Sequence, residues 1–88
     1  MTEAEFRQKL QEQGYGEPMP MEYAPRLDKP MHTHEQSAMG LVVSGEFILK
    51  LEDGRKSYQP GEWCELPAGT VHTESAGGDG ANALMAFK

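Results

Sequence analysis

After Pro18 the sequence is divided into short segments by turn-forming residues, and this division limits what the chain can fold into. The segments are rich in strand-forming side chains, as in MPMEYA, EFILKLE and EWCELP. Asp53-Gly54 predicts a tight hairpin because both central residues of that turn need positive φ, and Pro60-Gly61 predicts a type II turn. The pattern therefore predicts roughly six or seven short antiparallel strands.

The chain has 88 residues, which is enough for one small core but not for a second domain. Short strands with so little helix cannot bury both faces of a flat sheet, so we expect them to close into a barrel or sandwich. We therefore predict a single all-β domain over residues 1–88, in which residues 17–88 form the barrel. The glycine-rich stretch AGGDG at residues 76–80 is predicted to be a loop.

Residues 1–16 are predicted to form one short helix and a linker. Thr2 followed by Glu5 has the form of a capping box, and Phe6 with Leu10 gives a narrow apolar stripe that ends before Gly14. A helix with so narrow a stripe is expected to lie against the outside of the barrel or against a second subunit. Because the stripe and the strand edges would otherwise be poorly covered, we predict a homodimer.

Charge and composition exclude several classes of partner. The net charge of −6 repels a phosphate backbone, so nucleic acid is not expected to bind. No apolar run is long enough to span a bilayer, and the polar first eighteen residues contain no signal-peptide segment, so no membrane association is expected. The single cysteine, Cys64, allows no internal disulfide and is typical of a protein of the reducing cytoplasm. We therefore expect a cytoplasmic protein.

The three histidines point to a metal site. His32 and His34 are one residue apart in a predicted strand, so their imidazoles should emerge on the same face, with Gln36 following them. His72 comes after a Pro-x-Gly turn, and Glu74 shares its face. A single histidine is more often an exposed strand residue or a hydrogen-bonded core residue. Three converging neutral imidazoles, however, form a common site for one divalent transition metal, which could be iron, manganese, nickel, copper or zinc.

The frame around these histidines resembles the paired motifs of the cupin superfamily. HTHEQSAMGLVVSG keeps the H-x-H pair and its following glycine at the expected spacing, with His32, His34 and Gly45. GEWCELPAGTVH matches the second motif without a gap, with Gly61, Pro67, Gly69 and His72. The resemblance implies a single cupin barrel, also described as a double-stranded β-helix or jelly roll, with one short N-terminal helix. It also implies that His32, His34 and His72 are metal ligands.

Two positions depart from the resemblance. Ala38 stands where it implies a metal-binding glutamate, and Ala76 replaces an asparagine sometimes found after the second motif. Gln36 could compensate, either as a ligand or through a hydrogen bond to a metal-bound water. Glu74 could act as a general base or orient an imidazole, although a glutamate at a strand end often faces solvent. Cys64 is expected to pack as a small apolar residue rather than to ligate.

These observations leave three functional hypotheses. The first is a small metalloenzyme that acts on a small polar or carboxylated molecule, with dioxygenase and isomerase chemistry both represented among similar cupins. The second is a non-catalytic module that binds or senses a small ligand or a metal. The third is a purely structural barrel with an empty site.

Overall fold

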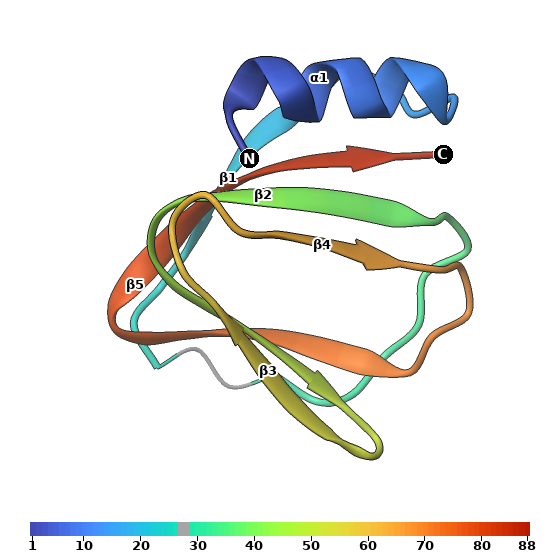
Figure 1. Ribbon diagram of the computed structural model, residues 1–88. Helices are drawn as coiled ribbons and strands as arrows, with labels where there is room; N and C mark the ends of the chain where they lie inside the picture. Colours follow the sequence, from blue (N-terminus) through green and yellow to red (C-terminus); the bar gives the residue numbers. More distant parts are fainter. Residues whose placement is uncertain (27–28) are drawn as a thin grey trace.

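Two long strands, β2 (Ala38–Leu51) and β5 (His72–Phe87), form the frame of the barrel. The computed structural model describes residues 1–26 and 29–88. Its other elements are the helix α1 (Glu3–Glu12) and the strands β1 (Met19–Tyr23), β3 (Gly54–Tyr58) and β4 (Trp63–Leu66). Figure 1 shows that β2 and β5 each curve from one layer of strands into the other, and that α1 lies along the outside of one layer. The predicted all-β cupin barrel with one N-terminal helix is therefore confirmed.

The strands pair antiparallel in the order β1-β5-β2-β3, and β4 also pairs with β2. They are fewer and longer than the turn pattern predicts. The segments expected to be separate on either side of Gly45 join to form β2. The segment AGGDG, predicted to be a loop, lies inside β5. Pairing with β2 holds the two ends of this stretch, with Ala76 opposite Phe47 and Ala81 opposite Gly45, and residues 77–80 lie at the register shift between these pairs.

Glycine and register shifts let β2 bend sharply. The pairing with β5 shifts between Val42 and Ser44 and again between Gly45 and Phe47, as at β-bulges. Gly45 has a φ of 77°, a conformation that favours glycine, and it lies against the backbone of Gly80. The bend brings the two halves of β2 into opposite layers and leaves an interior between them.

The two predicted turns have different outcomes. At Pro60-Gly61 the type II turn is confirmed, since the Glu62 amide donates to the Gln59 carbonyl at 2.9 Å and Gly61 has a φ of 88°. The predicted β2–β3 hairpin forms, but its register is shifted by one residue. Leu51 pairs with Gly54, so Glu52 and Asp53 are the turn residues, and neither has positive φ.

The helix α1 covers the outside of the barrel. Its capping box is confirmed, because the Glu5 amide donates to Thr2 Oγ1 at 3.1 Å and the Thr2 amide donates to Glu5 Oε1 at 2.8 Å. Phe6 and Leu10 are 0% and 2% exposed, in a cluster with Met39, Leu41 and Ala86 of the underlying strands. The expectation that the apolar stripe is poorly covered within one chain is therefore wrong, because these outward-facing strand residues form the matching surface.

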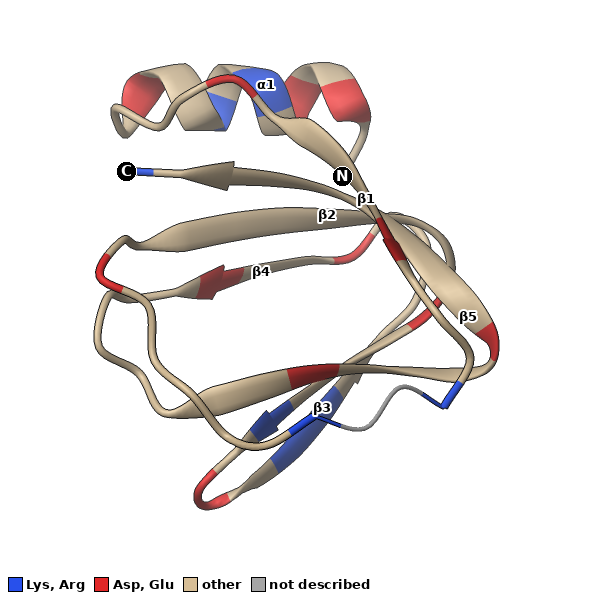
Figure 2. Cartoon of the chain, turned by 180° about the vertical axis from the view of Figure 1, so that it is seen from behind, with Lys and Arg blue, Asp and Glu red and all other residues tan. Residues whose placement is uncertain are grey.

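A second apolar cluster lies between the two layers of strands. It contains Val42, Phe47, Leu49, Ala83 and Met85, among other buried residues. Acidic residues are spread over α1, β4, β5 and the turns, whereas β3 carries basic ones (Figure 2). Within the described part of the chain, no helix has the length and apolar character needed to cross a membrane.

We expect Gly45→Ala to destabilise the fold much more than Gly14→Ala. Both glycines have a φ of 77°, so each substitution costs about 1–2 kcal/mol of left-handed backbone strain. At Gly45 the added Cβ would also overlap the Gly80 carbonyl oxygen and lie 2.9 Å from the Ala81 Cα, whereas at Gly14 no atom is within 4 Å. Urea unfolding should therefore show a loss of about 2–5 kcal/mol for Gly45→Ala. Equal losses would contradict the close packing at this bend.

Candidate metal centre

A pair of backbone hydrogen bonds brings two of the histidines together. The His32 amide donates to the His72 carbonyl at 2.8 Å, and the His72 amide donates to the His32 carbonyl at 2.9 Å. The Gly69 amide donates to the His34 carbonyl at 3.0 Å, which holds the same loop against the turn before β5. The expectation that His32 and His34 lie in a continuous strand is wrong, because β2 begins only at Ala38. Their imidazoles nevertheless converge.

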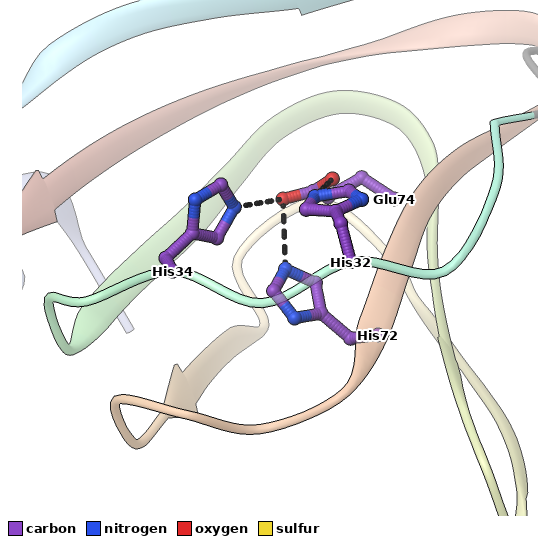
Figure 3. Close-up of side chains that lie close together, drawn as sticks. All are labelled: His32, His34, His72 and Glu74. Atoms are coloured by element: carbon purple, nitrogen blue, oxygen red, sulfur yellow. Dashed lines mark hydrogen bonds and ion pairs between the residues drawn. The ribbon is translucent and has the colours of Figure 1, made fainter.

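The three imidazoles surround the carboxylate of Glu74 (Figure 3). The Nε2 atoms of His72 and His34 lie 3.3 Å and 3.8 Å from Glu74 Oε1, and His32 Nε2 lies 3.4 Å from Oε2. The ring centroids are 4.7–5.0 Å apart. One ligand atom from each residue can be chosen so that all four lie within 4.8 Å of one another.

Backbone carbonyls fix the tautomers of two of these rings. His32 Nδ1 is 3.1 Å from the Pro30 carbonyl oxygen, and His72 Nδ1 is 2.8 Å from the Thr70 carbonyl oxygen. A carbonyl oxygen can only accept a hydrogen bond, so in both rings Nδ1 carries a hydrogen and donates it. In the neutral rings, Nε2 therefore presents a lone pair toward Glu74.

This arrangement suits a cation. Lone pairs of His32 Nε2, His72 Nε2 and the Glu74 carboxylate face one another across 3.3–3.4 Å, and like partial charges repel unless a cation lies among them. Nitrogen and carboxylate donors in this number are typical ligands of divalent transition metals. The cluster is enclosed on one side and open on the other, since the side chains of His72 and His34 are 1% and 43% exposed. The residues present thus fit the metal that the cupin resemblance implies.

The other sequence candidates lie in different surroundings. Gln36 is in a bend and is exposed, so the predicted inward orientation from strand alternation does not hold, and its role near the metal stays a prediction. Glu35 is also exposed. Ala38 is buried and lines the cavity, at the position where the resemblance implies a glutamate. The carboxylate of the cluster instead comes from Glu74, on β5.

The cluster borders a cavity of about 200 Å³ between the two layers of strands. Most of its wall is apolar, and the lining side chains are Met21, Tyr23, Lys29, His32, His34, Ala38, Phe47, Leu49, Cys64, Leu66, Glu74, Met85 and Phe87. Sequence reasoning missed Tyr23 and Lys29 as lining residues. The place of Tyr23 at the end of a short strand was visible in the sequence, but the direction of its side chain depends on the barrel closing.

The lone cysteine is part of the cavity wall and not of the cluster. Cys64 is 6% exposed and shares the inward face of β4 with Leu66, as the sequence predicts. Burial, assisted by the negative charge of Glu74, raises the pKa of the Cys64 thiol to about 11, although a backbone hydrogen bond from Gly40 acts in the opposite direction. The thiol is therefore protonated at neutral pH and packs as a small apolar group.

The chain was compared with models of known protein families. The family model for the cupin domain matches residues 19–87, so the chain belongs to the cupin family. A search of the curated proteins finds no match.

Solved structures of cupin-fold proteins resemble the chain. DMSP lyase DddQ from Ruegeria pomeroyi DSS-3 is 20% identical, with a TM-score of 0.70 over 78% of this chain and 36% of the lyase. The polyketide cyclase RemF from Streptomyces resistomycificus is 26% identical, with a TM-score of 0.65 over 77% of this chain and 49% of the cyclase. A protein of unknown function from Rhizobium leguminosarum bv. viciae 3841 is 18% identical, with a TM-score of 0.70 over 90% of this chain and 86% of that protein. The chain therefore matches about a third of the lyase and half of the cyclase.

We expect the free energy of unfolding to fall as the pH rises from about 9 to about 11. The folded pKa of the Cys64 thiol lies above its ordinary value of 9.0, so its contribution to stability is complete below that value and is lost as the pH approaches 11. The loss should total about 2–3 kcal/mol. In Cys64→Ala the fall should begin only near pH 10, where tyrosines ionise in the unfolded chain. Identical pH profiles from urea unfolding would contradict this assignment.

Proposed function

We propose that the protein holds one divalent transition metal with His32, His34, His72 and Glu74 and uses it to bind and transform a small carboxylated molecule. The observation that supports this most directly is the convergence of three imidazoles on one carboxylate, with Nε2 of His32 and of His72 left as an acceptor by the carbonyl bonds at Nδ1. Iron, manganese, nickel, copper and zinc are all compatible with such donors. The metal would supply Lewis acidity toward a ligand oxygen, and a redox-active ion would add oxygen chemistry.

Charge favours an anionic ligand. Three neutral imidazoles and one carboxylate leave a divalent ion with a net charge of about +1. Lys29 adds a further positive charge to the lining of the same cavity. The negative charge of Glu74, which also lines the cavity, is the carboxylate included in the net charge of about +1. The rest of the described lining is mostly apolar. A small carboxylate with an apolar body matches both features, because its charge would meet the metal and Lys29 while its body packs against the walls.

The reaction class is open between lyase-like, isomerase-like and dioxygenase-like chemistry. The lyase and the cyclase that resemble this chain show that enzymes are built on this fold. One observation favours the second candidate, a non-catalytic binding or sensing module. Glu74 faces all three imidazoles at 3.3–3.8 Å, so a carboxylate engaged with the metal would not be free to act as a general base.

Metal analysis of matched variants tests the proposal. After purification without chelators, and reconstitution with each ion in turn, the wild-type protein should retain about one metal per chain. His72→Ala and Glu74→Gln should each weaken metal affinity by about tenfold or more. Glu35→Gln makes the same chemical change at an exposed neighbour of His34, and its metal affinity should equal that of the wild-type protein.

Two results would contradict the metal site. One is the absence of bound metal in the wild-type protein with every ion tested. The other is an equal loss of affinity in Glu35→Gln and Glu74→Gln, which would mean that total charge and not the cluster governs binding.

We also propose that the protein is a cytoplasmic homodimer that associates through β1. Among the described residues this strand pairs only with β5, and Met19 and Met21 are 53% and 38% exposed along it. Exposed apolar side chains on an unpaired strand edge favour pairing with a second copy. Light scattering at micromolar concentration should give twice the chain mass of 9.7 kDa, and Met19→Lys should shift the mass toward one chain. A wild-type monomer would contradict the dimer.

A further inference from the structure

We propose that the Tyr23 hydroxyl donates a hydrogen bond to a carboxylate oxygen of the small molecule that occupies the cavity, and so helps to select that ligand. This inference rests on the proposed function, because it assigns Tyr23 to the ligand that the metal would bind. It identifies a specificity residue that lies outside both cupin motifs.

The ring of Tyr23 is held firmly in the barrel. The residue ends β1, is 8% exposed and packs against Phe47 with ring centroids 5.0 Å apart and an interplanar angle of 56°. Edge-on and tilted aromatic contacts of this kind stabilise a core. A phenylalanine would make the same contacts, so packing explains the ring of Tyr23 but not its hydroxyl.

The hydroxyl has no hydrogen-bond partner among the residues that the structure describes, although Tyr23 is more than nine-tenths buried. Among the described residues, every fully enclosed side-chain oxygen has a hydrogen-bond partner, so the Tyr23 oxygen, which has none, is not fully enclosed. Tyr23 lines the cavity, which is where its hydroxyl is accessible. A hydroxyl that is accessible from a cavity and makes no bond to the protein is free to bond a molecule that enters the cavity. A ligand atom in the cavity would supply the partner that the protein does not.

The hydroxyl would act as a donor. Burial raises the pKa of Tyr23 well above its ordinary value of 10.0, with smaller contributions from the negative charge of Glu74 and from Cys64. The phenol therefore keeps its proton at neutral pH. A protonated phenol beside a cavity that also contains Lys29 favours a ligand rich in acceptor oxygens. A carboxylate has two such oxygens, so one could bind the metal while the other accepts from Tyr23.

The apolar walls define the remainder of the ligand. Phe47, Leu49, Leu66 and Met85 face the same cavity as Tyr23. A cavity of about 200 Å³ accommodates a small organic acid but not a polymer or a nucleotide. The geometry thus points to a monocarboxylate with a compact apolar body, and benzoate is a probe of that class.

Calorimetric titration of zinc-loaded protein with benzoate tests the inference. Tyr23→Phe keeps the ring and removes the hydroxyl, and should weaken benzoate binding about 3- to 10-fold. Tyr58→Phe is the matched control, because Tyr58 also packs near Phe47, at 6.3 Å between centroids, but does not line the cavity. Its benzoate affinity should equal that of the wild-type protein.

Thermal unfolding distinguishes a ligand-binding role of the Tyr23 hydroxyl from a role in stabilising the fold. Without ligand, Tyr23→Phe should unfold at a temperature no lower than that of the wild-type protein, since it removes a hydroxyl that makes no hydrogen bond to the described residues. A hydroxyl that served the fold would instead lower the midpoint when removed. The inference therefore predicts weaker benzoate binding together with undiminished stability.

Zinc content separates the possible failures. If zinc does not bind to the wild-type protein, the proposed function and this inference both fall. If zinc binds to all three proteins at about one per chain, but benzoate fails to bind or binds equally to the wild-type protein and Tyr23→Phe, only the role of Tyr23 is overturned.

Discussion

The candidate site depends on one pair of backbone hydrogen bonds, between His32 and His72. These bonds, at 2.8 Å and 2.9 Å, join the loop before β2 to the first residue of β5. They place the imidazoles of His32 and His72 side by side. The carbonyl oxygens of Pro30 and Thr70 orient these rings by accepting a hydrogen bond from Nδ1 of each. Backbone pairing therefore brings together side chains that are forty residues apart in sequence. It does not require His32 and His34 to lie in a regular strand.

The barrel has two apolar clusters, one between α1 and the outer face of the strands and one between the two layers of strands. On the outside, Phe6 and Leu10 of α1 cover the strands, in an apolar cluster separate from the interior one. On the inside, the small side chain of Ala38 lines the cavity beside larger side chains such as Phe47 and Met85. A polar cluster can then lie at the edge of an apolar cavity, where a low dielectric strengthens its interaction with a cation or an anionic ligand.

Local rules predicted what depends on local chemistry. The capping box at Thr2 and the turn at Pro60-Gly61 follow from residue types at fixed spacing. The convergence of His32, His34 and His72 was implied by the resemblance to the cupin motifs, because it depends on backbone pairing between residues distant in sequence. What the sequence could not give depends on closure of the barrel. Strand alternation placed Gln36 inward, but the irregular loop before β2 turns it to solvent. The stretch AGGDG at residues 76–80 is typical of a loop, yet it lies inside β5, because pairing with β2 on both sides of it, at Ala76 and Ala81, continues the strand across a register shift. The inward direction of Tyr23 likewise depends on long-range packing.

X-ray absorption spectroscopy of the zinc-loaded protein tests the central claim most directly, because it reports the atoms bound to the ion. The account predicts a first shell of nitrogen and oxygen at about 2.0–2.2 Å, with imidazole scattering from three histidines. It also predicts that one oxygen contribution changes in Glu74→Gln. A sulfur neighbour at about 2.3 Å would show that Cys64 is a ligand, and a shell without imidazole scattering would show that the histidines do not hold the ion. Either result would contradict the account.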